Sequence, residues 1–256
     1  MNSMAIEVLT PRYGIAWYPW AVQYFFMIAV SYSALLLTVP GLIFGNKNYQ
    51  PLAKVALLVT VTCTLVGPVA LLADLHQPLR FWHFYANLNT QSWMSIGSLL
   101  LPLYLVIVLA YAWLAWRPAM QEQAQEPGWI GKLSGWISMG SWQAPRWMLV
   151  LAGLGALAFA FGIMLYTGAE VAILKSRPLW HTNWLPVMFV LTGLVAAAGL
   201  VVLINRLMTG NDEEINRQGL KVIFVSMALA AVVAALWVSE GITGFSPSVE
   251  AAFESL

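Results

Sequence analysis

Long runs of residues without Asp, Glu, Lys or Arg dominate this sequence and restrict what the chain can fold into. Six such runs are long enough for a helix of the roughly 20 residues that cross the hydrocarbon core of a bilayer. They cover residues 13–46, 55–73, 81–116, 147–169, 178–205 and 222–239. Only 9% of the residues are charged, whereas a soluble domain carries about 25%. The sequence therefore predicts a membrane protein.

We predict an all-α polytopic membrane protein, a single integral membrane domain over residues 1–256 that forms a bundle of six transmembrane helices. The predicted spans are about 17–44, 52–73, 92–116, 146–169, 183–205 and 220–240. Residues 118–145 form the longest linker, which is too polar to span. Because the linker is rich in tryptophan, we expect it to lie along the membrane interface, with the tryptophans Trp129, Trp136 and Trp142.

Small residues at every fourth position predict where helices approach closely. One such stripe lies in the fourth span, at Ala152, Ala156 and Ala160. The sixth span carries two more, formed by Ala230 with Ala234 and by Ala231 with Ala235. We expect both spans to use these stripes as packing seams.

The distribution of Lys and Arg predicts the orientation, because basic loops resist translocation. Loops 1, 3 and 5 carry eight basic residues: Lys47, Lys54, Arg117, Lys132, Arg146, Arg206, Arg217 and Lys221. The opposite side carries four, Arg12, Arg80, Lys175 and Arg177. Both termini are therefore expected in the periplasm. This topology brings three acids at helix C-terminal ends, Asp74, Glu170 and Glu240, to the outer side.

The polar segment from Ala73 to His83 is the main candidate for a functional site. It places Asp74, His76, Arg80 and His83 directly after an uncharged apolar span. A carboxylate at the C-terminal end of a hydrophobic helix faces an unfavourable macrodipole, and it is tolerated mainly where it is paired or used. Asp74 is thus the strongest candidate, although Asp74 and Arg80 could also form a purely structural pair.

The residue inventory argues against several other chemistries. A haem anchor needs two axial ligands per haem from facing helices, and none of the three histidines, His76, His83 and His181, lies within a predicted span. Because Cys63 is the single cysteine, an iron–sulfur cluster ligated by thiolates is excluded. Ionisable residues are missing from the span centres, where a proton pump would need them. The basic residues are scattered and give no indication of nucleic-acid binding. We also predict no metal site.

A polar, protonatable cluster with an aromatic and apolar surround suits a lipid-soluble quinol. Its ring needs a hydrogen-bond acceptor that takes a proton on oxidation, and its isoprenoid tail needs a slot open to lipid. Asp74 could provide the acceptor, together with His76, Arg80, Tyr85 or Gln23. Histidines beside tryptophans, such as His83 and His181, could equally be ordinary interfacial residues.

Several motifs resemble one family. The segment Ala-Asp-Leu-His-Gln-Pro-Leu-Arg-Phe-Trp at 73–82, followed by Ser-Trp-Met-Ser-Ile-Gly-Ser at 92–98, resembles the Asp-Leu-Gly-x-Pro-x-Arg and Ser-x-Met-Ser-x-Gly motifs of NrfD/PsrC-like polysulfide reductase membrane subunits. The second half is also similar to that family. It contains Tyr166-Thr167-Gly168, Arg177-Pro178-Leu179-Trp180, Leu185-Pro186 and Phe189. The matches cover residues 15 to about 205.

This resemblance implies a quinol-oxidising or quinone-reducing anchor in the bacterial cytoplasmic membrane. Such anchors bind quinone or menaquinone near the outer surface and dock to a four-cluster iron–sulfur subunit and a molybdopterin subunit, in complexes acting on polysulfide, thiosulfate or tetrathionate. Asp74 is the ligand position carried over. Gln23 and Tyr24 stand where some members have His or Asn, and Ser92 and Trp93 open the second motif. Family members commonly have eight spans, whereas this sequence predicts six.

Two other classes of function remain open. A non-catalytic membrane anchor or assembly subunit would bind the same partners without a quinone site. A small-molecule permease is the third hypothesis. We expect the chain itself to carry neither haem nor an iron–sulfur cluster.

Overall fold

The computed structural model describes residues 19–75, 77–172, 182–208 and 210–243. These residues form helices and connecting loops, and no strand occurs among them. In chain order the elements are α1 (Pro19–Thr38), η1 (Val39–Ile43), η2 (Lys47–Tyr49), α2 (Gln50–Asp74), η3 (Pro78–Arg80), α3 (His83–Ala86), α4 (Trp93–Gln123), α5 (Trp129–Ile137), α6 (Arg146–Ala172), α7 (Trp184–Met208) and α8 (Glu213–Thr243).

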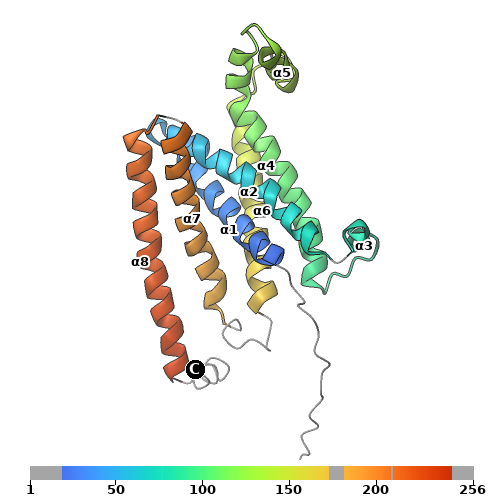
Figure 1. Ribbon diagram of the computed structural model, residues 1–256, viewed down its shortest axis with the longest axis vertical. Helices are drawn as coiled ribbons and strands as arrows, with labels where there is room; N and C mark the ends of the chain where they lie inside the picture. Colours follow the sequence, from blue (N-terminus) through green and yellow to red (C-terminus); the bar gives the residue numbers. More distant parts are fainter. Residues whose placement is uncertain (1–18, 76, 173–181, 209, 244–256) are drawn as a thin grey trace, which may run out of the picture.

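Within the described ranges, six helices are long and apolar enough to cross a membrane. They are α1 with the π-helical turn η1, α2 with η2, α4, α6, α7 and α8. This confirms the prediction of an all-α polytopic membrane protein with six spans. In Figure 1 the long helices run side by side, with α5 beyond one end of the bundle and α3 near the other.

Two of the spans are longer than the sequence predicted. The helix expected to end near residue 116 continues to Gln123, and the one expected from about 220 begins at Glu213. At α8, the Asp212 carboxylate accepts hydrogen bonds from the backbone amides of Glu214 (2.8 Å) and Ile215 (3.3 Å), which is the ordinary chemistry of a helix N-cap. The cap therefore places this helix start within a polar segment that hydropathy assigns to a loop.

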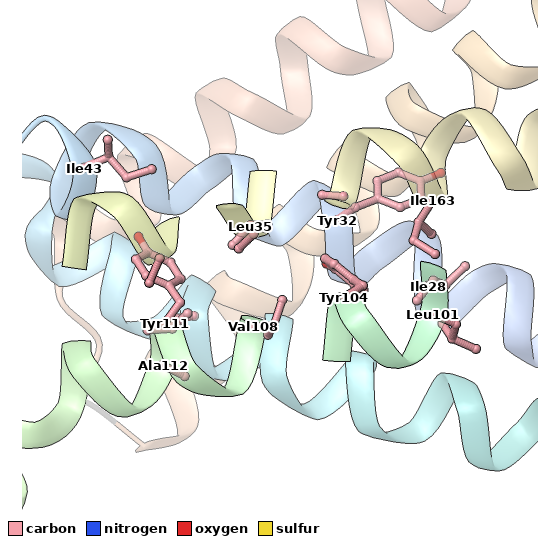
Figure 2. Packing of buried hydrophobic residues seen from close by; sticks show 14 of the residues in the cluster. Ile28, Tyr32, Leu35, Ile43, Leu101, Tyr104, Val108, Tyr111, Ala112 and Ile163 are labelled. Atoms are coloured by element: carbon pink, nitrogen blue, oxygen red, sulfur yellow. The ribbon is translucent and has the colours of Figure 1, made fainter. Parts of the chain in front are cut away.

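The main core lies where α1, α2, α4 and α6 meet. Figure 2 shows side chains from three of these helices converging there, among them Tyr32, Tyr104 and Ile163. The alanine stripe of α6 is buried, with Ala156 0% exposed, which confirms the predicted seam. On α8, Ala230 and Ala234 are half-buried, whereas Ala231 and Ala235 are exposed, so only the first of the two stripes predicted there is covered within the described part of the protein.

Hydroxyl groups join the helices inside this core. Ser31 Oγ on α1 lies 2.5 Å from Thr64 Oγ1 on α2 and 2.8 Å from the Tyr104 hydroxyl on α4. One to two turns further along, the Thr38 and Tyr111 side-chain oxygens are 3.1 Å apart. In the membrane interior polar groups need partners within the protein, and such interhelical bonds hold neighbouring helices in register.

One end of the bundle is built around a buried arginine, and we call it the Arg117 end. Arg117 is 1% exposed. It donates hydrogen bonds to the carbonyl oxygens of Ser138 (3.0 Å), Gly140 (3.0 Å) and Trp142, and its guanidinium carbon lies 3.9 Å from the centre of the Trp142 ring. Gly140 has a φ of +96°, a conformation that glycine adopts readily and that turns this loop toward the arginine. Arg117 thereby fixes the loop that follows α5.

Candidate functional site at the Asp74 end

The opposite end, which we call the Asp74 end, is formed by the last turns of α2 and α6 and the first turns of α1 and α4. Helix α2 stops at Asp74 because Leu75 adopts an extended backbone (φ −68°, ψ 124°). The chain then makes the short turns η3 and α3 before α4 begins at Trp93. Residues 77–92 therefore form a local cover beside the helix ends, and Phe84 and Tyr85 from α3 reach the cavity described next.

A cavity of about 360 Å³ lies at this end, which we call the Asp74 cavity. It has contributions from α1, α2, α3, α4 and α6, and its size falls within the range usual for small-molecule sites. Its wall is formed by Ala21, Tyr24, Phe25, Pro68, Leu71, Leu72, Asp74, Leu75, Phe81, Phe84, Tyr85, Met94, Gly97, Ser98, Leu101, Pro102, Leu105, Tyr166 and Glu170.

Two carboxylates and three phenol groups line this otherwise apolar space. Asp74 and Glu170 come from the last turns of α2 and α6, and the phenols belong to Tyr24, Tyr85 and Tyr166. Tyr166 and Glu170 lie one helical turn apart, on the same face of α6. An apolar pocket with a few convergent polar groups is the usual composition of a binding site for an organic ligand.

The wall of this cavity includes Tyr24, a deeply buried tyrosine of α1. Tyr24 is 2% exposed, and its hydroxyl has no hydrogen-bond partner among the described residues. Leaving a buried polar group without a partner costs about 1–3 kcal/mol. Because Tyr24 lies on the wall of the Asp74 cavity, its hydroxyl is a candidate partner for a ligand oxygen there.

Gly97 is required for the position of Tyr166. A Cβ atom added at Gly97 on α4 would lie 2.5 Å from the Tyr166 hydroxyl and would overlap the ring of that residue. Tyr166 itself is 5% exposed. The missing side chain at position 97 therefore lets a tyrosine of α6 cross to α4 and form part of the cavity wall.

The structure brings together some of the residues predicted from sequence. Tyr24, Asp74 and Tyr85 all line the Asp74 cavity. Gln23, Arg80, Ser92 and Trp93 lie at the same end but are not among the lining residues, and Arg80 is exposed on η3. The predicted site residue His76 lies outside the described residues, as do His181 and the Arg177–Trp180 motif.

Sequence reasoning left Tyr166, Glu170 and Gly97 out of the candidate site. Glu170 was noted only as an acid at a helix end, and Tyr166 only as part of a motif. The spacing of Tyr166 and Glu170 was a stronger signal, because residues i and i+4 share one face of a helix and both side chains are polar. Finding the cavity also required knowing that α6 packs against α4, which no local pattern specifies.

Two further features of the described residues bear on chemistry. Across those residues no group of three or more His, Cys, Asp and Glu side chains comes together to hold a metal ion. A second hollow lies on the surface of α8, beside Arg217, Leu220, Lys221, Phe224 and Val225. Its residues come from a single helix, so it lacks the enclosure of the Asp74 cavity.

Comparison with known proteins agrees with this architecture. The family model described as "Polysulphide reductase, NrfD" matches residues 7–252. The chain belongs to the NrfD family. This NrfD-family chain is therefore a multi-pass membrane protein of bacterial type, and the resemblance deduced from its motifs is confirmed.

Its curated relatives are subunits of reductases. The chain is 34% identical to a tetrathionate reductase subunit of Salmonella typhimurium, over 78% of this chain and 52% of that protein. It is 25% identical to a polysulfide reductase chain of Wolinella succinogenes, over 78% and 62%, and 24% identical to a selenate reductase subunit of Mesobacillus selenatarsenatis, over 73% and 47%. The chain thus spans about half to three fifths of the length of these relatives. Because they are subunits of reductases, the similarity supports a role within an oxidoreductase complex.

Proposed function

We propose that this NrfD-family chain is the quinone-reactive membrane subunit of a molybdopterin oxidoreductase. It oxidises a quinol, or reduces a quinone, in the Asp74 cavity and exchanges electrons with an iron–sulfur partner subunit. The observation that supports this most strongly is the meeting of two carboxylates with the unpartnered Tyr24 hydroxyl in one cavity beside a lipid-facing bundle. The relatives point to tetrathionate, selenate or polysulfide as the class of terminal substrate.

The residues of the cavity fit a quinol ring. Aromatic and aliphatic side chains such as Phe25, Phe84 and Met94 suit its apolar faces. The Tyr24 hydroxyl can donate to, or accept from, one ring oxygen. Asp74 and Glu170 supply acceptors for the hydroxyl hydrogens of the quinol, as general-base chemistry requires. Asp74 is half-buried and close to the polar cover, which gives its proton a short route to water.

The reaction balances with these groups alone and an external electron acceptor. Oxidation of one quinol breaks two O–H bonds, yields one quinone and releases two protons and two electrons. The protons pass to the Asp74 and Glu170 carboxylates, and the electrons pass to the iron–sulfur partner. Because electron transfer weakens steeply with distance, the partner must dock at the Asp74 end, near the cavity.

We also propose that the Asp74 end faces the periplasm. Eight of the twelve basic residues are on the side of the Arg117 end, which is expected to stay in the cytoplasm. In intact cells, a membrane-impermeant maleimide should label Thr90→Cys, on the exposed loop before α4, and should not label Gln125→Cys, on the exposed segment after α4. The native Cys63 is buried and should give no background. The reverse labelling pattern would overturn this orientation.

The test of the function uses the carboxylates in the intact complex. Asp74→Asn and Glu170→Gln keep the size of each side chain and remove the base, so quinol-driven turnover should fall about 10²- to 10⁴-fold. The matched control is Glu122→Gln, the same chemical change at an exposed position of the Arg117 end. Reduced viologen, which delivers electrons directly to the partner subunits, should drive all three variants at nearly the wild-type rate.

Two outcomes would contradict the proposal. Full quinol activity in both Asp74→Asn and Glu170→Gln would leave the cavity without a catalytic role. A wild-type complex that turns over with viologen but not with any quinol would favour a non-catalytic anchor.

A further inference from the structure

The Asp74 cavity has two unlike ends. Its carboxylates and phenols gather near the last turn of α2, whereas the residues furthest from them are apolar. The lining positions on α4 recur every three or four residues, at Met94, Ser98, Leu101 and Leu105, so they form one continuous stripe along the helix. The apolar end is lined by Pro68, Leu71, Leu72, Leu101, Pro102 and Leu105.

The apolar end reaches into the membrane. At 1.5 Å per residue, the stripe from Met94 to Leu105 extends about 16 Å along α4, and the lining from Asp74 to Pro68 extends about 9 Å along α2. A hydrocarbon core is about 30 Å thick. The cavity therefore runs from the surface, where Asp74 lies, toward the middle of the bilayer, and α2 and α4 supply the apolar lining of its inner part.

The wall between α2 and α4 is the side that faces lipid. Leu72 is 41% exposed, and its neighbour Val69 and the α4 residue Val106 are 65% and 64% exposed. The walls from α1 and α6 are closed, because Ala21, Tyr24 and Tyr166 are each at most 5% exposed, and the exposed lining residues Phe81 and Tyr85 belong to the cover at the membrane surface. A long apolar tail that leaves the cavity sideways must therefore pass between α2 and α4.

We propose that this wall is a lateral portal which binds the first isoprene units of the quinol tail and selects quinols that carry a long tail. This inference rests on the proposed function, because the ring must occupy the polar end of the same cavity. Pro68 and Pro102, one on each wall, contribute apolar rings to the lining of the portal. Leu71, Leu72, Leu101 and Leu105 supply the remaining contact surface.

The test compares two substrates in the complex purified with its partner subunits. The ratio of kcat/KM for menaquinol with its full tail to kcat/KM for menadiol, which has the same ring and no tail, measures how much the tail contributes. Leu105→Trp narrows the portal and should lower this ratio at least tenfold, mainly through KM for the long-tailed quinol. The matched control is Leu103→Trp, which adds the same bulk two residues away at a 51% exposed position outside the cavity wall and should leave the ratio unchanged.

A second variant and a labelling experiment test the portal independently in case Leu105→Trp fails to fold. Leu72→Trp approaches the portal from α2 at a partly exposed position and should lower the ratio in the same direction. In the wild-type complex, a quinone with a photoreactive diazirine in its first isoprene units should form adducts on peptides from 68–72 or 101–105. Adducts confined to α7 or α8, or a ratio that neither variant at the portal changes, would overturn the portal. A wild-type complex that oxidises neither quinol would instead overturn the proposed function, and the portal with it.

Discussion

At the Arg117 end of the bundle, a buried arginine and a buried asparagine bond to the protein itself, whereas at the Asp74 end an equally buried tyrosine lies on the wall of a cavity. The Arg117 guanidinium donates to three backbone carbonyls, and the Asn205 side chain donates to the Asp212 carbonyl and the Asn216 side chain at 2.8 Å each. Tyr24 is as deeply buried, yet its hydroxyl has no partner within the described ranges. The difference indicates that the first end stabilises the fold and that the second is shaped for a ligand.

The largest effect should come from breaking the Arg117 end. Arg117→Ala removes three hydrogen bonds from a charged donor, each worth about 1.5–3 kcal/mol, and leaves the Ser138 carbonyl without the guanidinium, while Gln121 Nε2 still donates to the carbonyls of Gly140 and Trp142. We expect little of the variant protein to accumulate in the membrane. Arg206→Ala, which removes an exposed arginine at the same end, is the control and should accumulate normally. Immunoblots of membrane fractions measure the amount of each variant. A normal amount of Arg117→Ala would contradict the claim that the Arg117 end stabilises the fold.

A smaller and more specific effect is expected at Gly97. Gly97→Ala should displace the Tyr166 ring from the cavity wall, and a misplacement of about 1 Å in a reactive site can cost 10²-fold. We expect quinol turnover about ten- to a hundredfold lower, with the viologen-driven rate retained. The control is Gly162→Ala in α6, where a Cβ atom would meet Leu100 of α4 at an ordinary 3.5 Å. Equal losses in the two variants would show that helix packing, rather than Tyr166, controls the activity.

Most of the scaffold follows from hydropathy, because the bilayer sets the length of an apolar helix. Reliance on hydropathy also explains why the predicted end of α4 and the predicted start of α8 were wrong. Arg117 lies within the extra turns of α4, where the folded protein provides hydrogen-bond partners for its side chain. Asp212 precedes α8 and caps the extra turns of that helix. Hydropathy measures affinity for lipid and contains no information about these contacts.

The site could be predicted only in part, for a different reason. Asp74 and Tyr85 lie in or near a conspicuous polar segment, and Tyr24 came from the family resemblance. Glu170 and Gly97 have meaning only when α6 is packed against α4. The alanine stripes show the same limit, because the stripe on α6 is buried, whereas on α8 Ala230 and Ala234 are half-buried and Ala231 and Ala235 are exposed. Small residues permit a close approach without specifying which helix approaches.

The most direct test of this account is the substitution Tyr24→Phe, measured for stability and for binding. Removing a buried hydroxyl that has no partner should leave the thermal stability of the ligand-free complex unchanged or slightly raised. Loss of a hydrogen bond worth about 1–2 kcal/mol should raise the Kd of a fluorescent quinol-analogue inhibitor about five- to thirtyfold. Tyr49→Phe, at a 38% exposed position of the Arg117 end, should change neither quantity. If Tyr24→Phe instead destabilises the ligand-free complex and binds the inhibitor as tightly as wild type, the hydroxyl serves the fold, and the Asp74 cavity is not the quinol site.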